Sequence, residues 1–164
     1  MSKDLEHSFV TLLQENQKVA HKICRIYTSD ADSHNDLFQE ITIQLWKAYP
    51  KFRGDSKFST WMYRVALNTA ITLYRKSKKT VKIEVFDSIE FKLSDEAYDD
   101  GVEHQLKLLY AAVKELNDIE KALVFLYLED KTYKEIASTL GITEVNARVK
   151  MNRVKTKLKK ILNP

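Results

Sequence analysis

The sequence predicts an all-α protein, built from two small helical domains that are joined by an acidic linker. Its 164 residues include three Gly and two Pro, whereas average usage would give roughly twenty of the two together. Because the tight turns of a β fold recruit Gly and Pro, their scarcity disfavours strands. Apolar residues instead recur every three or four positions, and several of these stretches begin with a helix-capping pattern.

The predicted first domain covers residues 1–80. Apolar residues at helical spacing predict three helices in it, over about 3–28, 33–49 and 60–76. Ser33, followed three residues later by Asp36, resembles a capping box at the start of the second helix, and Pro50 stops that helix. A polar and aromatic loop leads into the third helix.

The predicted linker covers residues 81–103, and the predicted second domain covers residues 104–164. Within 83–103 there are eight acidic side chains, one basic side chain and no clear helical period, which is typical of a linker that does not collapse on itself. The second domain opens with a periodic apolar stretch, and Asn117 with Glu120 caps the next helix.

The last two predicted helices form a helix-turn-helix. Thr132 and Glu135 make a capping box for a short helix that ends at Gly141, and Thr143 opens a basic amphipathic helix. This order is that of a duplex-reading motif, although domains that only pack also contain such pairs. Polar and basic side chains of the last helix favour DNA binding, namely Arg148, Lys150, Asn152, Arg153, Lys155 and Lys157.

Two segments concentrate positive charge. Residues 51–82 carry nine basic and one acidic side chain, and residues 147–164 carry seven basic and no acidic ones. Two basic surfaces separated by an acidic stretch are expected of a protein that binds a polyanion at two places. The alternative is a pair of solvated, Lys-rich helix faces.

The first basic segment is also rich in aromatic residues. Rings and cations are interleaved along it, in the order Phe52, Arg53, Lys57, Phe58, Trp61, Tyr63, Arg64, Tyr74 and Arg75. Rings give stacking platforms for unpaired bases, and neighbouring cations follow the nucleic-acid backbone. Each ring taken alone is better explained as part of the core of a helical domain, whereas the segment as a whole favours single-strand binding.

At this point the sequence resembles a known family. The motif F-R-G-x-S-x-F-x-T-W starting at Phe52, with N-T-A after it, is similar to region 2 of the bacterial extracytoplasmic-function sigma factors. The motif Y-K-E-I-A-x-x-L-G-I-T starting at Tyr133 is similar to their region 4. The resemblance covers both halves of the chain in the family's order.

The resemblance implies the function and the partners. It implies a factor that binds core RNA polymerase at the β′ clamp and the β flap, directs it to promoters and nucleates melting. It also implies promoter DNA as a ligand, both as duplex and as melted non-template strand, and an anti-sigma factor as inhibitor. The residues that align with the polymerase-binding segment are Asp36, Gln39, Glu40, Leu45 and Trp46.

The DNA-binding residues are likewise implied by the resemblance. Those that align with the loop and helix that capture the melted minus-ten element are Phe52, Arg53, Lys57, Phe58, Ser59, Thr60, Trp61, Tyr63, Arg64 and Asn68. Those that align with the reader of the minus-thirty-five element are Thr143, Asn146, Arg148, Val149, Lys150, Asn152, Arg153 and Lys155.

The reading helix departs from the family's pattern. Where the family commonly has G-T-V-K-S-R, residues 145–150 read Val, Asn, Ala, Arg, Val and Lys. A β-branched Val149 in place of a small polar residue suits contact with a thymine methyl group. The preferred promoter sequence stays open.

Other classes of protein are disfavoured. No apolar run approaches the roughly twenty residues of a membrane span, and the first residues lack a signal-peptide profile, so a cytoplasmic protein without membrane insertion is expected. Cys24 is a single cysteine that is expected to be buried, and the four His are scattered. We therefore expect no catalytic site, no metal site and no cofactor.

Two alternatives remain at this level. The first is an autonomous helix-turn-helix regulator that binds duplex DNA without polymerase, which would have little use for the aromatic loop. The second is an enzyme that acts on nucleic acid, which the lack of a clustered set of His, Cys and carboxylate residues disfavours.

Overall fold

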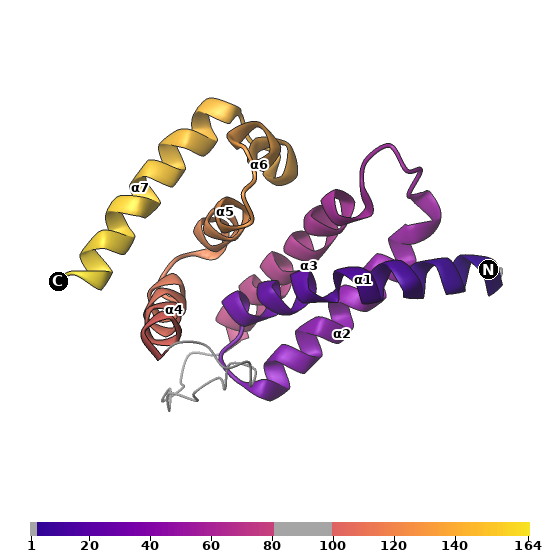
Figure 1. Ribbon diagram of the computed structural model, residues 1–164, viewed down its shortest axis with the longest axis horizontal. Helices are drawn as coiled ribbons and strands as arrows, with labels where there is room; N and C mark the ends of the chain where they lie inside the picture. The colour runs from indigo at the N-terminus through magenta and orange to yellow at the C-terminus, as the bar shows by residue number, and fades with distance from the viewer. Residues whose placement is uncertain (1–2, 81–99) are drawn as a thin grey trace. The chain divides into compact units, whose positions relative to one another are not determined.

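The computed structural model describes residues 3–80 and 100–164, and these form α-helices and one 3-10 turn with no strand among them. They divide into two compact units, one with helices α1 to α3 and the other with α4 to α7 (Figure 1). The predicted all-α class is confirmed. Most of the predicted linker lies outside the described residues, and α4 begins at Asp100, within the range assigned to that linker.

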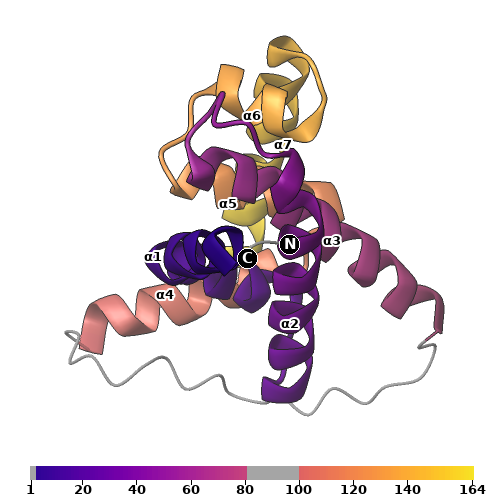
Figure 2. The ribbon, with the colours of Figure 1, turned by 90° about the vertical axis from the view of Figure 1, so that its right-hand side faces the viewer.

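The first unit is a bundle of three helices that all contact one another (Figure 2). Its elements are α1 (Lys3–Tyr27), α2 (Ala31–Ala48), the 3-10 turn η1 (Tyr49–Lys51) and α3 (Phe58–Thr80). Leu37, Ile41 and Leu45 recur every four residues on α2, and all three are buried against α1 and α3. This spacing places an apolar stripe on one side of the helix, and the burial of that stripe holds the bundle together.

Cys24 lies in this core, as the sequence predicted. Its side chain is fully buried, and the loss of water around the thiol raises its pKa to about 12. Because the thiolate is the reactive form, this cysteine is a packing residue.

The start of α2 differs from the prediction. The cap is Asp30, whose carboxylate accepts hydrogen bonds from the Ser33 backbone N at 2.7 Å and from the Ser33 hydroxyl at 2.9 Å. The predicted capping box of Ser33 with Asp36 is therefore wrong. Both Asp and Ser are good N-cap residues, and the extended backbone at Asp30 decides between them.

The second unit contains α4 (Asp100–Val113), α5 (Asp118–Leu128), α6 (Tyr133–Leu140) and α7 (Glu144–Leu162), and α7 contacts the other three. Both predicted capping boxes are confirmed: Asn117 with Glu120 starts α5, and Thr132 with Glu135 starts α6. Gly141 ends α6 with φ of 71°, a left-handed conformation that a residue without Cβ adopts at little cost.

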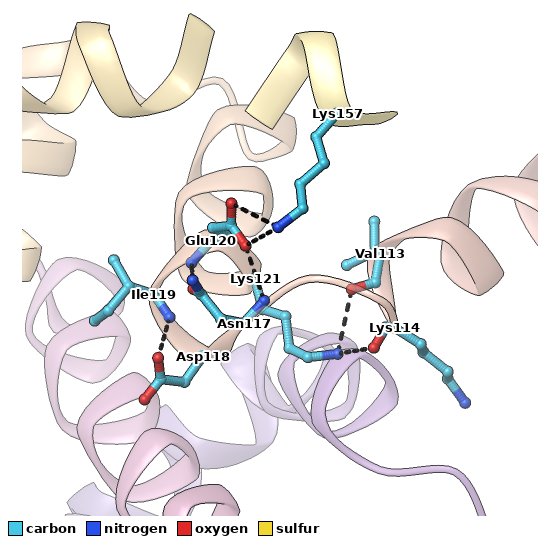
Figure 3. Close-up of polar contacts among 8 residues, drawn as sticks. All are labelled: Val113, Lys114, Asn117, Asp118, Ile119, Glu120, Lys121 and Lys157. Carbon is cyan, nitrogen blue, oxygen red and sulfur yellow. Dashed lines mark hydrogen bonds and ion pairs between the residues drawn. The ribbon is translucent and has the colours of Figure 1, made fainter. Parts of the chain in front are cut away.

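A buried lysine connects α4 to α5 (Figure 3). Lys121 is 2% exposed, and its Nζ donates hydrogen bonds to the carbonyl oxygens of Val113 at 3.2 Å and of Lys114 at 3.1 Å. Carbonyls at the end of a helix lack partners within the helix, so the ammonium group caps α4. The Glu120 carboxylate in turn pairs with Lys157 Nζ at 3.0 Å, which ties α5 to α7.

Replacing Lys121 by methionine is expected to destabilise the second unit by about 1 to 3 kcal/mol, because the carbonyl oxygens of Val113 and Lys114 lose their side-chain donor. Both tryptophans, Trp46 and Trp61, lie in the first unit. Thermal unfolding followed by circular dichroism should therefore shift, whereas the transition followed by tryptophan fluorescence should stay in place. A variant as stable as the parent chain would contradict the capping role.

Candidate nucleic-acid and protein interfaces

Four aromatic rings gather where α2, η1 and the start of α3 meet. The ring of Phe52 lies 5.0 Å from that of Trp61 and 5.9 Å from that of Phe58, and the rings of Phe58 and Trp61 are 5.4 Å apart. The fourth ring is that of Tyr49, whose centre lies 6.1 Å from the centre of the Phe52 ring. These centroid separations are those of packed aromatic pairs, so the four rings form one cluster.

The loop over this ring cluster carries the predicted cations. Residues 53–57 are all exposed, so Arg53 and Lys57 lie at the surface near half-buried Phe52 and Trp61. Gly54 has φ of 78°, a backbone conformation that side chains with a Cβ rarely adopt, and it lets the chain turn back toward α3. A surface of partly exposed rings beside cations has the chemistry that stacks unpaired bases.

Two predicted minus-ten residues lie in the core. Phe58 is 7% exposed and Tyr63 is 6% exposed, so neither ring presents a face to a ligand. Their contribution is to pack α3 against the rest of the unit. Ser59 is half-buried.

The remaining minus-ten residues share one side of α3. Thr60, Arg64 and Asn68 are exposed and recur every four residues, which extends a polar stripe along the helix from the ring cluster. The rings and this stripe both involve the first turns of α3, because Phe58 and Trp61 belong to the ring cluster and Thr60 begins the stripe.

The predicted polymerase-binding residues divide between surface and core. Asp36 and Gln39 are exposed, and Glu40 is half-exposed and accepts a hydrogen bond from Gln44 Nε2 at 2.8 Å. Leu45 is fully buried because it lies four residues after Ile41 in the core stripe of α2, so it makes no surface contact. Leu45 is therefore a packing residue.

An apolar hollow of about 460 Å³ lies between α1 and α2, and it includes a residue that the sequence analysis missed. Ile43 is 45% exposed at its rim, in line along α2 with Asp36, Gln39 and Glu40. The lining residues are Glu6, Phe9, Val10, Thr42, Ile43 and Trp46. The available signal was an isoleucine on the face of α2 that otherwise carries Asp36, Gln39 and Glu40.

Two histidines that are distant in the sequence meet between α1 and α2. His21 Nδ1 lies 2.9 Å from His34 Nε2, within hydrogen-bonding distance, and the His21 ring stacks on Phe38 at 4.3 Å. Burial lowers the pKa of both imidazoles, and the positive charge of Arg25 lowers both further. Within the described residues no group of three or more His, Cys, Asp or Glu is placed to hold a metal ion.

The first unit is expected to lose stability as the pH falls below about 6.5, the ordinary value for histidine. Since folding lowers the pKa of His21 and His34, the unfolded chain takes up protons before the folded chain does. The midpoint temperature of unfolding, followed by tryptophan fluorescence, should be highest above that pH. His34→Gln should make this midpoint depend less on pH. The control is His7→Gln at an exposed position on α1. An equal slope in all three proteins would contradict the assignment.

Helix α7 follows the turn at Gly141 and presents most of the predicted minus-thirty-five residues. Thr143 caps it by accepting a hydrogen bond from the Asn146 backbone N at 3.1 Å. The exposed members of the predicted set are Thr143, Asn146, Arg148, Val149, Asn152 and Arg153, and Lys150 and Lys155 are half-exposed.

Several cations of this unit have partners within the unit. Arg148 Nη2 lies 2.9 Å from Glu144 Oε1, and its guanidinium group lies 5.5 Å from the ring centre of Tyr133. The ammonium of Lys155 lies 4.4 Å from the ring centre of Tyr127, and a hydrogen bond to Tyr127 raises the pKa of Lys155. Arg148 and Lys155 are seven residues apart, so both pairs hold positive charge along the same side of α7.

Comparison with known proteins decides the family. The family of Sigma-70 region 2 matches residues 12–80, and that of Sigma-70, region 4 matches residues 106–158. The ECF RNA polymerase sigma factor SigM of Bacillus subtilis is 30% identical over 140 residues, which cover 83% of this chain and 83% of SigM. This chain belongs to the ECF RNA polymerase sigma factors. The family resemblance found in the sequence is confirmed.

Other relatives of this sigma factor agree. The RNA polymerase sigma-H factor of Pseudomonas aeruginosa is 29% identical, with 90% of this chain and 83% of that protein aligned. Solved structures of two further proteins are similar in fold. The structure of CnrH in complex with the cytosolic domain of CnrY has a TM-score of 0.68 at 17% identity, and the aligned part covers 96% of this chain and 89% of CnrH. RpoE in complex with the anti-sigma factor NepR, from Bartonella quintana, has a TM-score of 0.72 at 16% identity, with 98% of each chain covered.

In this sigma factor, the match to region 2 lies within the unit of α1 to α3, and the match to region 4 lies within the unit of α4 to α7. Among the helices that the structure describes, none has the length and apolar character to cross a bilayer. The family consists of transcription initiation factors, which direct RNA polymerase to promoters, rather than catalytic enzymes.

Proposed function

We propose that this sigma factor, which directs RNA polymerase to promoters, uses three separate surfaces to do so. Region 2, in the unit of α1 to α3, holds core polymerase and opens the minus-ten element, and region 4, in the unit of α4 to α7, reads the minus-thirty-five element. The observation that carries the proposal is the ring cluster with its basic loop, because a regulator that binds only duplex DNA has little use for it.

The melting step follows from the energetics of unpaired bases. A base leaves the duplex at a cost of a few kcal/mol, and stacking on an aromatic ring returns about 1 to 3 kcal/mol per base. Half-buried Phe52 and Trp61 supply ring surface, and exposed Arg53 and Lys57 supply charge for the strand's phosphates. Region 2 would therefore capture a base of the non-template strand after it opens, which biases the DNA toward the melted state.

Core polymerase would dock on α2. The exposed face with Asp36, Gln39 and Ile43 adjoins the apolar hollow that Trp46 lines, so a partner there gains both apolar burial and polar contacts. By family resemblance the partner is the β′ clamp, and the β flap would contact region 4.

Control by an anti-sigma factor is part of the proposal. CnrH and RpoE, which share the fold, were solved in complex with CnrY and with the anti-sigma factor NepR. A protein of that kind would hold this sigma factor inactive in the cytoplasm by covering surfaces that polymerase or DNA need.

The test is transcription in vitro with core RNA polymerase of the source organism, with and without this protein, on a pool of genomic promoter fragments. We expect initiation from a small set of discrete start sites, and only when both proteins are present. Alignment of those sites yields both promoter elements. Absence of initiation, together with duplex binding that core polymerase does not change, would instead establish an autonomous DNA-binding regulator.

A further inference from the structure

The outward side of α7 carries a stripe of uncharged residues to which the proposed function assigns no individual base contact. Val145, Val149, Asn152 and Thr156 are all exposed, and each lies two residues before a member of the inward stripe, which consists of Ala147, Met151, Val154 and Leu158. Two residues turn an α-helix by about 200°. The uncharged stripe therefore points directly away from the core of region 4.

The two valines dominate the first turns of this stripe. Val145 is 69% exposed and Val149 is 42% exposed, and residues four apart on a helix lie next to each other on its surface, about 6 Å apart. Isolated exposed valines are ordinary, but these two adjoin each other on the helix that follows the turn. They form one apolar patch at the N-terminal end of α7, next to the turn of the helix-turn-helix.

Cations flank this valine pair on both sides. Arg148 and Lys155 lie along one side of the stripe and Arg153 lies along the other. Arg148 forms an ion pair with Glu144 and lies over the ring of Tyr133, and Lys155 lies over the ring of Tyr127. Positive charge thus borders an uncharged centre, which complements a groove with phosphates on both rims and base edges at its floor.

We propose that Val145 and Val149 read the methyl groups of two thymines in the major groove of the minus-thirty-five element. The methyl group of thymine is the one apolar group that the base edges present in the major groove. Because the valines lie about 6 Å apart and base pairs are stacked every 3.4 Å, the two thymines lie one or two base steps from each other. This inference rests on the proposed role of α7 in promoter binding.

The test replaces thymine by deoxyuridine, which removes the methyl group and keeps every hydrogen-bonding atom. Each thymine of the minus-thirty-five element of one promoter is replaced in turn, and the Kd for the polymerase holoenzyme is measured by competition. We expect about a three- to tenfold loss of affinity at two thymines and no change at the others, since one buried methyl group contributes roughly fourfold.

The protein side of the test uses alanine. Val145→Ala and Val149→Ala raise helix propensity, so a folding defect is not expected. Each variant should bind the thymine promoter more weakly and should lose its sensitivity to deoxyuridine at one position. Val102→Ala, at a similarly exposed position on α4, is the matched control and should keep full sensitivity.

The outcomes separate this inference from the proposed function. If all deoxyuridine fragments bind equally while a scrambled minus-thirty-five element loses binding, the methyl-reading inference is wrong and region 4 still reads that element. If the scrambled element also binds equally, the proposed role of α7 fails. If the alanine variants weaken binding to core polymerase in the absence of DNA, the valine pair is a protein-docking patch and the inference is overturned.

Discussion

Trp61→Ala is expected to reduce transcription from a double-stranded promoter by roughly ten- to a hundredfold, while transcription from a template melted in advance at the minus-ten element falls much less. Trp61 is half-buried in the ring cluster, with Phe52 5.0 Å and Phe58 5.4 Å away. Its removal takes away ring surface and loosens Phe52, and stacking of one base contributes about 1 to 3 kcal/mol. Transcript yield on paired templates, with and without a bubble, measures the effect.

The control for this variant is Phe38→Ala. Phe38 is also a half-buried ring of region 2, but it stacks on His21, away from the loop at residues 53–57. The Phe38→Ala variant should lower the stability of region 2, but it should not reduce transcription from the double-stranded template more than transcription from the melted one. In the Trp61→Ala protein, Trp46 is the remaining tryptophan, so its fluorescence reports whether region 2 is folded. Equal losses on both templates would show that the ring cluster does not act in melting.

Ile43→Asp is expected to weaken binding to core polymerase by about ten- to a hundredfold. Ile43 lies at the rim of the apolar hollow between α1 and α2, and full burial of an isoleucine contributes about 1.5 to 3 kcal/mol. A carboxylate at the same place would have to be buried without a partner, which adds a further cost. Because the residue is exposed in the free protein, folding should be unaffected, and affinity for core polymerase can be measured by fluorescence anisotropy.

Two further variants make this prediction specific. Ile43→Leu keeps the apolar surface and should retain most of the affinity. Thr72→Asp places the same charge at an exposed position on α3 that does not line the hollow, and it should leave the binding to core polymerase close to that of the parent. If Ile43→Asp binds as tightly as Ile43→Leu, the hollow is not part of the polymerase contact.

Local patterns in the sequence were sufficient to predict the all-α fold class, the positions of the helices and most of the helix ends. The caps at Asn117 and Thr132 and the turn at Gly141 depend on groups within four residues of one another, so the sequence contains all that they require. The family motifs are equally local. Where two neighbouring residues are both good caps, as at Asp30 and Ser33, the pattern predicts a helix start but leaves its position open by a few residues.

The candidate sites were predicted as segments rather than as surfaces. The sequence identified the aromatic loop, the second helix and the last helix, but it assigned Phe58, Tyr63 and Leu45 to contacts although they are buried. It also passed over the exposed Ile43 and Val145. Residue type alone does not tell a ring that stacks on a ligand from a ring that packs in the core.

Only the tertiary structure decided which residues face solvent and which distant groups meet. His21 contacts His34 across two helices, and Lys121 reaches back over a turn to the carbonyl oxygens of Val113 and Lys114. A helical period gives the direction of each side chain about its own axis, whereas burial depends on which neighbouring helices lie there. A helix between two others buries a wide arc, which places Tyr63 in the core beside Met62 and leaves Arg64 outside.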